Sequence, residues 1–114
     1  MGVRGAGERI QSTLLSWAGV SAQPHRFGGR EYRIGRREIG HVHGDWLVDV
    51  PLPKKVRDEA VAAGRAEPHH VLPESGWVSV HLSQEADIEG AIALLRLSYD
   101  AAQRQRARSR EAPG

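Results

Sequence analysis

The stretch from residue 37 to residue 50 most constrains the fold, because it contains two strand-like segments on either side of Gly44-Asp45. Glycine at the first position of a two-residue loop is typical of a type II′ turn, which joins antiparallel strands. We therefore predict a β-hairpin with strands over 37–43 and 46–50. Prolines at 51 and 53 end the second strand, because proline cannot donate a hydrogen bond to a sheet.

The length of the predicted loop also predicts the register of the hairpin. With two loop residues, His43 lies opposite Trp46. Side chains two apart on a strand share a face, so His41 and His43 would lie together on the more apolar face of the sheet. A bulge at Gly40 would move Glu38 onto the histidine face, and the sequence leaves this alternative open.

Apolar periodicity and turn residues predict the remaining elements. Helical spacing indicates helices over 8–18, 53–63 and 84–103, of which the last has the widest apolar stripe. Alternating residues indicate further strands over 30–34 and 77–82. This order predicts an α+β fold, with an antiparallel or mixed sheet of four to five strands and helices packed mainly on one face.

The length of 114 residues fits one folded domain. We divide the chain into an N-terminal helix and lead-in over 1–22, an α+β domain over 23–103, and a disordered arginine-rich tail over 104–114. The tail has a net charge of +3 and the rest of the chain −1, so the basic pI of about 9.5 comes from the tail. This distribution disfavours nucleic acid as a partner.

Composition restricts the location and the chemistry of the protein. No run of about 18 apolar residues is present, and the first residues lack the apolar core of a signal peptide. We therefore expect a cytoplasmic protein with no membrane partner. The absence of cysteine excludes disulfides, thiolate metal sites and cysteine nucleophiles. The sequence leaves the oligomeric state open.

Histidines and carboxylates form the candidate site. Neutral imidazole is a good ligand for zinc, iron or copper, and carboxylates complete such sites. The metal set expected from the sequence is therefore His41, His43 and His69, with Glu38 or Glu67. The same residue types suit acid–base chemistry, because an imidazole pKa of about 6.5 allows proton exchange at neutral pH. The alternative is structural, with one histidine hydrogen-bonded in the core and the other packed against a tryptophan.

Serine chemistry and phosphate binding have weaker support. Ser75 and Ser79 are only nominal nucleophiles, because no Gly-x-Ser-x-Gly elbow surrounds either of them. Neither a Gly-x-Gly-x-x-Gly pattern nor a P-loop is present, and Gly28-Gly29 indicates a turn. The histidine cluster therefore remains the main candidate site.

Four motifs over roughly residues 23–100 resemble the luciferase domain family, which occurs in fungal bioluminescence enzymes and in many short bacterial proteins. They are Glu38-Ile39-Gly40-His41-Val42-His43, the Glu-x-His at 67–69, Leu72-Pro73, and Gly76-Trp77-Val78. In the light-emitting members, the domain oxygenates a hydroxylated aromatic pyrone with molecular oxygen and has no known organic cofactor. The resemblance implies that one pocket is lined by Glu38, His41, His43, Glu67 and His69.

Two functions follow as hypotheses. The first is an oxidoreductase of the oxygenase type, with a small-molecule ligand and no cofactor; a divalent metal is the alternative. His41 or His43 would remove a hydroxyl proton, and Glu38 or Glu67 would fix the imidazole tautomer. His69 would stabilise the developing negative charge as a hydrogen-bond donor.

The second hypothesis is a non-catalytic module that binds a ligand or partner. The order of helices and strands, with Trp-Val-Ser-Val at 77–80 before the last helix, is also similar to the small YjbR-type domains. That similarity concerns the fold, and a fold does not determine a function. The sequence leaves the choice between enzyme and binding module open.

Overall fold

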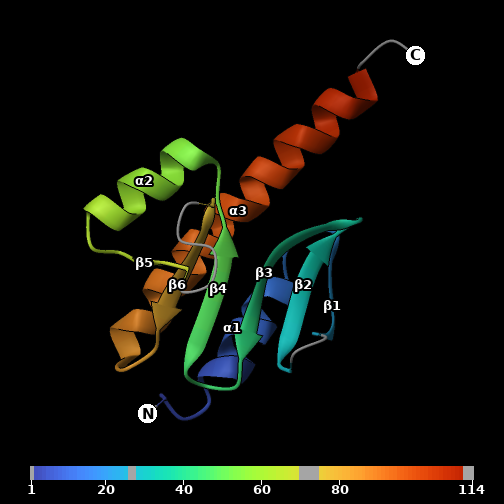
Figure 1. Cartoon of the computed structure of the whole chain (residues 1–114). Coiled ribbons are helices and arrows are strands. Elements are labelled where there is room, and N and C mark those ends of the chain that lie inside the picture. The colour runs from blue at the N-terminus through green and yellow to red at the C-terminus, as the bar shows by residue number, and fades with distance from the viewer. Residues whose placement is uncertain (1, 26–27, 70–74, 112–114) are drawn as a thin grey trace.

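The computed structural model describes residues 2–25, 28–69 and 75–111, with side chains through Arg108 (Figure 1). The described residues form one open six-stranded sheet in the order β1-β2-β3-β4-β6-β5, in which all neighbouring strands are antiparallel. This confirms the predicted α+β class. The strands are β1 (Val20–Pro24), β2 (Arg30–Ile34), β3 (Arg37–His43), β4 (Leu47–Pro51), β5 (Glu67–Pro68) and β6 (Trp77–His81).

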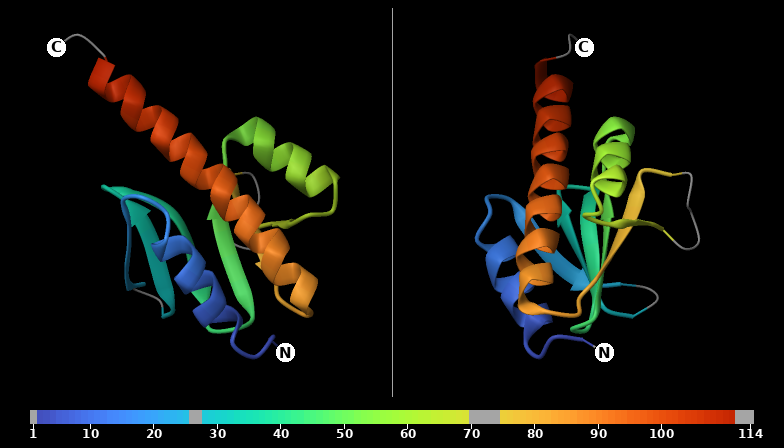
Figure 2. Two further views of the ribbon diagram at one scale, coloured as in Figure 1. Left: turned by 180° about the vertical axis from the view of Figure 1, so that it is seen from behind. Right: turned by 90° about the vertical axis from the view of Figure 1, so that its left-hand side faces the viewer.

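Two of the three described helices cover one face of the sheet (Figure 2). The helix α1 (Ala6–Leu15) packs on β1 and on α3 (Glu85–Glu111), and α3 crosses β2, β3, β4 and β6. The short helix α2 (Lys54–Ala62) lies near β6. No described helix is both long and apolar enough to cross a lipid bilayer.

The core lies between this face of the sheet and the two helices. Ile10 and Leu14 of α1 are fully buried in the same apolar cluster as Leu94 and Leu95 of α3. The sheet contributes alternate residues from its strands, among them Val48 and Val50 of β4. Because residues two apart share a face, the residue between these two valines points to the opposite side of the sheet.

Four features differ from the sequence expectation. The strand β1 was not predicted, and the boundary expected between residues 22 and 23 falls inside it. The segment expected to be a loop contains the short strand β5. The predicted end of the last helix near residue 103 is wrong, because α3 continues to Glu111. The expected tail is therefore helical over 104–111, while residues 112–114 lie outside the described residues.

The end of α3 contacts the turn that joins β2 to β3. The guanidinium of Arg37 donates a hydrogen bond to the side-chain oxygen of Gln105. The guanidinium of Arg106 lies beside Gly35, where an added Cβ would be 3.3 Å from one of its nitrogens. These contacts join residues about 70 positions apart, so no local pattern predicts them.

Candidate functional site

The hairpin of β3 and β4 has a different register from the one predicted. His43 lies opposite Leu47, and His41 lies opposite Asp49, so the loop has three residues rather than two. The prediction that the histidines occupy the more apolar face is therefore wrong. They point away from α1 and α3 and share their face with Asp49, because a shift of one residue reverses the face of every side chain.

The turn itself explains this register. Asp45 accepts hydrogen bonds from the backbone N–H groups of Gly5 and Gly7, at 3.2 and 2.8 Å, at the start of α1. The backbone of Trp46 accepts a 2.8 Å hydrogen bond from the N–H of Leu82. These contacts fix the loop through distant parts of the chain. They place the valines of β3 and β4 in the core and the polar residues on the opposite face.

A β-bulge brings Glu38 to the histidine face. In the pairing of β2 with β3, Tyr32 lies opposite Gly40 and Arg33 lies opposite Glu38, which leaves Ile39 as an extra residue. In a regular strand, residues 38 and 41 would lie on opposite faces of the sheet, because they are three positions apart. The bulge places both side chains on the same face. Oε2 of Glu38 lies 2.7 Å from Nδ1 of His41. The alternative that the sequence left open is thus the observed one.

Asp49 is the centre of the cluster, and its side chain is only 2% exposed. Its Oδ2 lies 2.9 Å from Nε2 of His41 and 3.2 Å from Nε2 of His43. Nε2 of His69, which follows β5, is 3.8 Å from the same oxygen. Oδ1 accepts a 2.6 Å hydrogen bond from the hydroxyl of Ser79 on β6. Three imidazoles and one hydroxyl therefore surround a single buried carboxylate.

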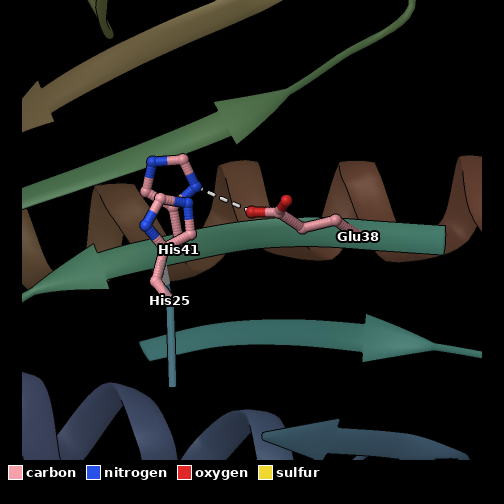
Figure 3. Close-up of side chains that lie close together, drawn as sticks. All are labelled: His25, Glu38 and His41. Atoms are coloured by element: carbon pink, nitrogen blue, oxygen red, sulfur yellow. Dashed lines mark hydrogen bonds and ion pairs between the residues drawn. The ribbon is translucent and has the colours of Figure 1, made fainter. Parts of the chain in front are cut away.

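Aromatic rings enclose this cluster. Figure 3 shows the ring of His25 stacked on the ring of His41. Their centroids are 4.1 Å apart. Trp77 lies 5.2 Å from the ring of His41 and 6.2 Å from the ring of His69. The cluster thus presents flat aromatic surfaces beside polar atoms, an arrangement that suits a planar ligand with polar substituents.

The charges at the centre follow from burial and hydrogen bonding. Burial acts to lower the pKa of His41, but hydrogen bonds to Asp49 and Glu38 outweigh it and raise the pKa to about 9. Burial and the positive charge of His41 lower the pKa of His43. Burial acts to raise the pKa of Asp49, but hydrogen bonds from His41 and Ser79 lower it to about 2. With no ion bound, neutral pH therefore leaves His41 cationic, His43 neutral and Asp49 ionised.

Four of the five residues expected from the sequence meet here, and one does not. His41, His43 and His69 converge on Asp49, and Glu38 joins the cluster through its contact with His41. Glu67 lies on β5, where its exposed carboxylate is 3.2 Å from Nε2 of His81. A cavity of about 340 Å³ beside β5 and β6 is lined by Glu67, Ser79 and His81 among others, and so adjoins the cluster through Ser79.

Sequence reasoning missed the residue at the centre. Asp49 is an acidic residue between two valines in an otherwise apolar strand, and such a buried acid is itself a signal of a site. The wrong hairpin register assigned it to the face opposite the histidines. His25 and Trp77 were also missed as neighbours, since their contacts cross between strands. The motif Leu72-Pro73 lies outside the described residues.

Two groups of three side chains among the described residues have the spacing of metal ligands. One is His25, Glu38 and His41, and the other is His41, His43 and Asp49; within each group the ligand atoms lie within 4.8 Å of one another. His69, the third residue of the metal set expected from the sequence, belongs to neither group. It lies next to the second group, at the 3.8 Å distance from Asp49 given above.

A larger cavity, of about 430 Å³, lies elsewhere in the molecule. It is formed by α1, β2 and the turn after β3, and its walls include Gln11, Arg30, Tyr32 and Asp45. Asp45 is already engaged by the N-terminus of α1, and the hydroxyl of Tyr32 is 3.3 Å from the side-chain oxygen of Gln11. Neither metal-ligand group lies in this cavity. We therefore place the candidate site at Asp49.

The sequence was compared with models of known protein families, and one family matches it. The model of the luciferase domain matches residues 36–98, which is more than half of the chain. Comparison with curated proteins and with solved structures gives no match. The matched segment contains the central residues of the cluster, namely Glu38, His41, His43, Asp49, His69, Trp77 and Ser79.

Proposed function

The chain belongs to the luciferase domain family, and from that premise we propose that it oxygenates a hydroxylated aromatic or similarly conjugated small molecule at the Asp49 cluster. The observation that carries the proposal is the convergence of three imidazoles on one buried carboxylate, beside the ring of Trp77. A planar substrate would stack on these rings and direct its hydroxyl to the imidazoles.

The contacts of each residue in the cluster indicate the role that it would have in the reaction. Both ring nitrogens of His41 are engaged by carboxylates, so this residue holds the geometry and the charge of the site. His43 and His69 approach Asp49 from the sides and are the groups that would meet the substrate. One would accept the hydroxyl proton, and the other would donate a hydrogen bond to the resulting oxyanion.

The proposed reaction balances without a further reactant. Transfer of the hydroxyl proton to an imidazole gives a conjugated anion. The anion supplies electrons to molecular oxygen and forms a carbon–oxygen bond. The imidazolium then returns its proton to the terminal oxygen, so the product is the hydroperoxide of the substrate. Fixed dipoles around the oxyanion would lower the barrier to the first step.

A panel of hydroxylated aromatic pyrones tests the proposal, with binding measured by calorimetry and turnover by an oxygen electrode. His69→Asn removes a proposed substrate contact and should lower oxygen uptake at least tenfold, as loss of an acid–base group does. His81→Asn is the matched control, because this exposed histidine pairs with Glu67 outside the cluster. Binding without oxygen uptake would overturn the oxygenase and favour the binding module. Absence of binding across the panel would overturn the proposed substrate class and with it the oxygenase.

A further inference from the structure

The nitrogens of His41 and His43 that face Asp49 have the spacing of a ligand set. Both are Nε2 atoms, and they lie 2.9 and 3.2 Å from the same carboxylate oxygen. A divalent metal at about 2.0–2.2 Å from each ligand keeps neighbouring ligand atoms roughly 3.0–3.5 Å apart. Two histidines and one carboxylate also form the ligand set of many iron-dependent oxygenases.

The outer contacts of these side chains support the same reading. Metal-binding histidines usually donate their second N–H to a carboxylate, which orients the ring. Here Nδ1 of His41 lies 2.7 Å from Glu38, so its Nε2 remains directed at Asp49. The second oxygen of Asp49 is held by Ser79 at 2.6 Å. Two of the three ligands are thus oriented by partners on the side away from the ion position.

The other group of three does not converge in this way. His25 and His41 are stacked, with only 29° between their ring planes, and Figure 3 shows Glu38 beside them. The lone pair of an imidazole nitrogen lies in the plane of the ring, so the lone pairs of these two stacked rings lie in separate planes, with 4.1 Å between the ring centroids. Stacked rings are therefore poorly placed to bind one ion together. His25 is therefore better explained as a ring that covers His41.

We propose that His41 Nε2, His43 Nε2 and Asp49 Oδ2 bind one divalent cation of the first transition series. With neutral imidazoles, Glu38 and Asp49 give the cluster two negative charges, which such a cation balances. The inference rests on the site of the proposed function and deepens it, because three protein ligands leave coordination positions for a substrate oxygen. When His43 is a ligand, His69 is the group that accepts the hydroxyl proton.

Cobalt(II) is the probe, because its visible absorption reports ligand number and geometry. The full chain is prepared without a histidine tag, treated with chelator and titrated with cobalt(II) in the absence of any substrate. We expect one equivalent to bind. His43→Asn should weaken binding at least a hundredfold. Glu38→Gln, which alters the orientation of His41 and removes one negative charge beside it, should weaken binding about 10–100-fold. His81→Asn should bind as the unaltered chain does, since His81 lies outside the cluster.

Two results would overturn the metal site: no cobalt(II) binding by the unaltered chain, or equal binding by the folded His43→Asn variant. The half-buried position of His43 makes it the test residue, because Asp49→Asn risks unfolding the protein. Failure of the metal site is distinguishable from failure of the proposed function. No cobalt(II) binding, together with oxygenation of a pyrone that His69→Asn abolishes, would overturn the metal site alone. Cobalt(II) binding with no pyrone binding would overturn the proposed function alone.

Discussion

His41 and Asp49 lie directly opposite each other on β3 and β4, and Nε2 of the histidine is 2.9 Å from Oδ2 of the aspartate. The pair is almost completely buried on the face of the sheet that α1 and α3 leave uncovered. An ion pair at this depth is largely shielded from water, so each partner stabilises the charge of the other. The consequences can be measured in the stability of the protein as well as in its chemistry.

We expect Asp49→Asn to destabilise the fold by about 3 kcal/mol, because it removes the more deeply buried of the two carboxylates that pair with the cationic His41. The free energy of unfolding from urea titration at neutral pH measures the effect. Glu67→Gln is the control: its carboxylate also pairs with a histidine, but both are exposed, so the cost should be at most about 1 kcal/mol. Equal costs for the two variants would contradict the central role of Asp49.

The pH dependence of stability should have a definite sign in metal-free protein. The pKa of His41 is raised from 6.5 to about 9 in the folded state, so its contribution is complete below about pH 6.5 and is lost as the pH rises through 9. We expect the free energy of unfolding to fall by on the order of 2–3 kcal/mol across that range, relative to the His41→Gln variant. Chemical unfolding at several pH values gives both curves, and parallel curves would contradict the assignment.

The close approach of β3 to α3 predicts a coupling between two residues. A Cβ at Gly40 would overlap the Cδ2 methyl of Leu95 and would lie 3.0 Å from the carbonyl oxygen of Asp49. Gly40→Ala should cost about 1–3 kcal/mol. Leu95→Ala should cost about 2–5 kcal/mol, as truncation of a buried leucine does.

The double variant of Gly40 and Leu95 should cost less than the sum of the single changes, because the truncation removes the overlap. Urea unfolding of the four proteins in the cycle measures this difference. Gly90→Ala is the control, because Gly90 lies on α3 with no atom within 4 Å of an added Cβ. It should leave the protein as stable or stabilise it by up to about 1 kcal/mol. Strict additivity of Gly40→Ala and Leu95→Ala would show that the two sites do not contact.

Deletion of residues 104–114 should have a small effect on thermal stability. Residues 104–108 are exposed or half-buried, and the deletion removes the contact of Gln105 with Arg37. We expect a loss below about 1 kcal/mol, which corresponds to at most about 4–8 °C in Tm. Deletion of 101–114 is the comparison, because it also removes the buried Ala101 and Ala102. If both deletions lower Tm by the same amount, the loss comes from residues 104–114 and not from the buried alanines, which would contradict the prediction.

Much of the fold was determined by local sequence. Alternation over 77–82 and the apolar stripe of the last helix are properties of single elements, and both elements are present. The shared face of His41 and His43 follows from the two-residue period of a strand, whatever the register of the hairpin. The luciferase domain resemblance also needed only the order of motifs, and the family match confirms it.

Tertiary structure decided which face the histidines occupy and what they contact. Gly44-Asp45 is compatible with a loop of two or three residues, and the choice depends on the hydrogen bonds of Asp45 to α1. Those bonds, with burial of the valines against α3, shift the register by one residue and turn Asp49 toward the histidines. Local sequence patterns cannot predict these contacts, because each contact joins residues far apart in the chain. The residue types of the site were therefore readable from the sequence, but its central carboxylate became evident only when the elements were packed together.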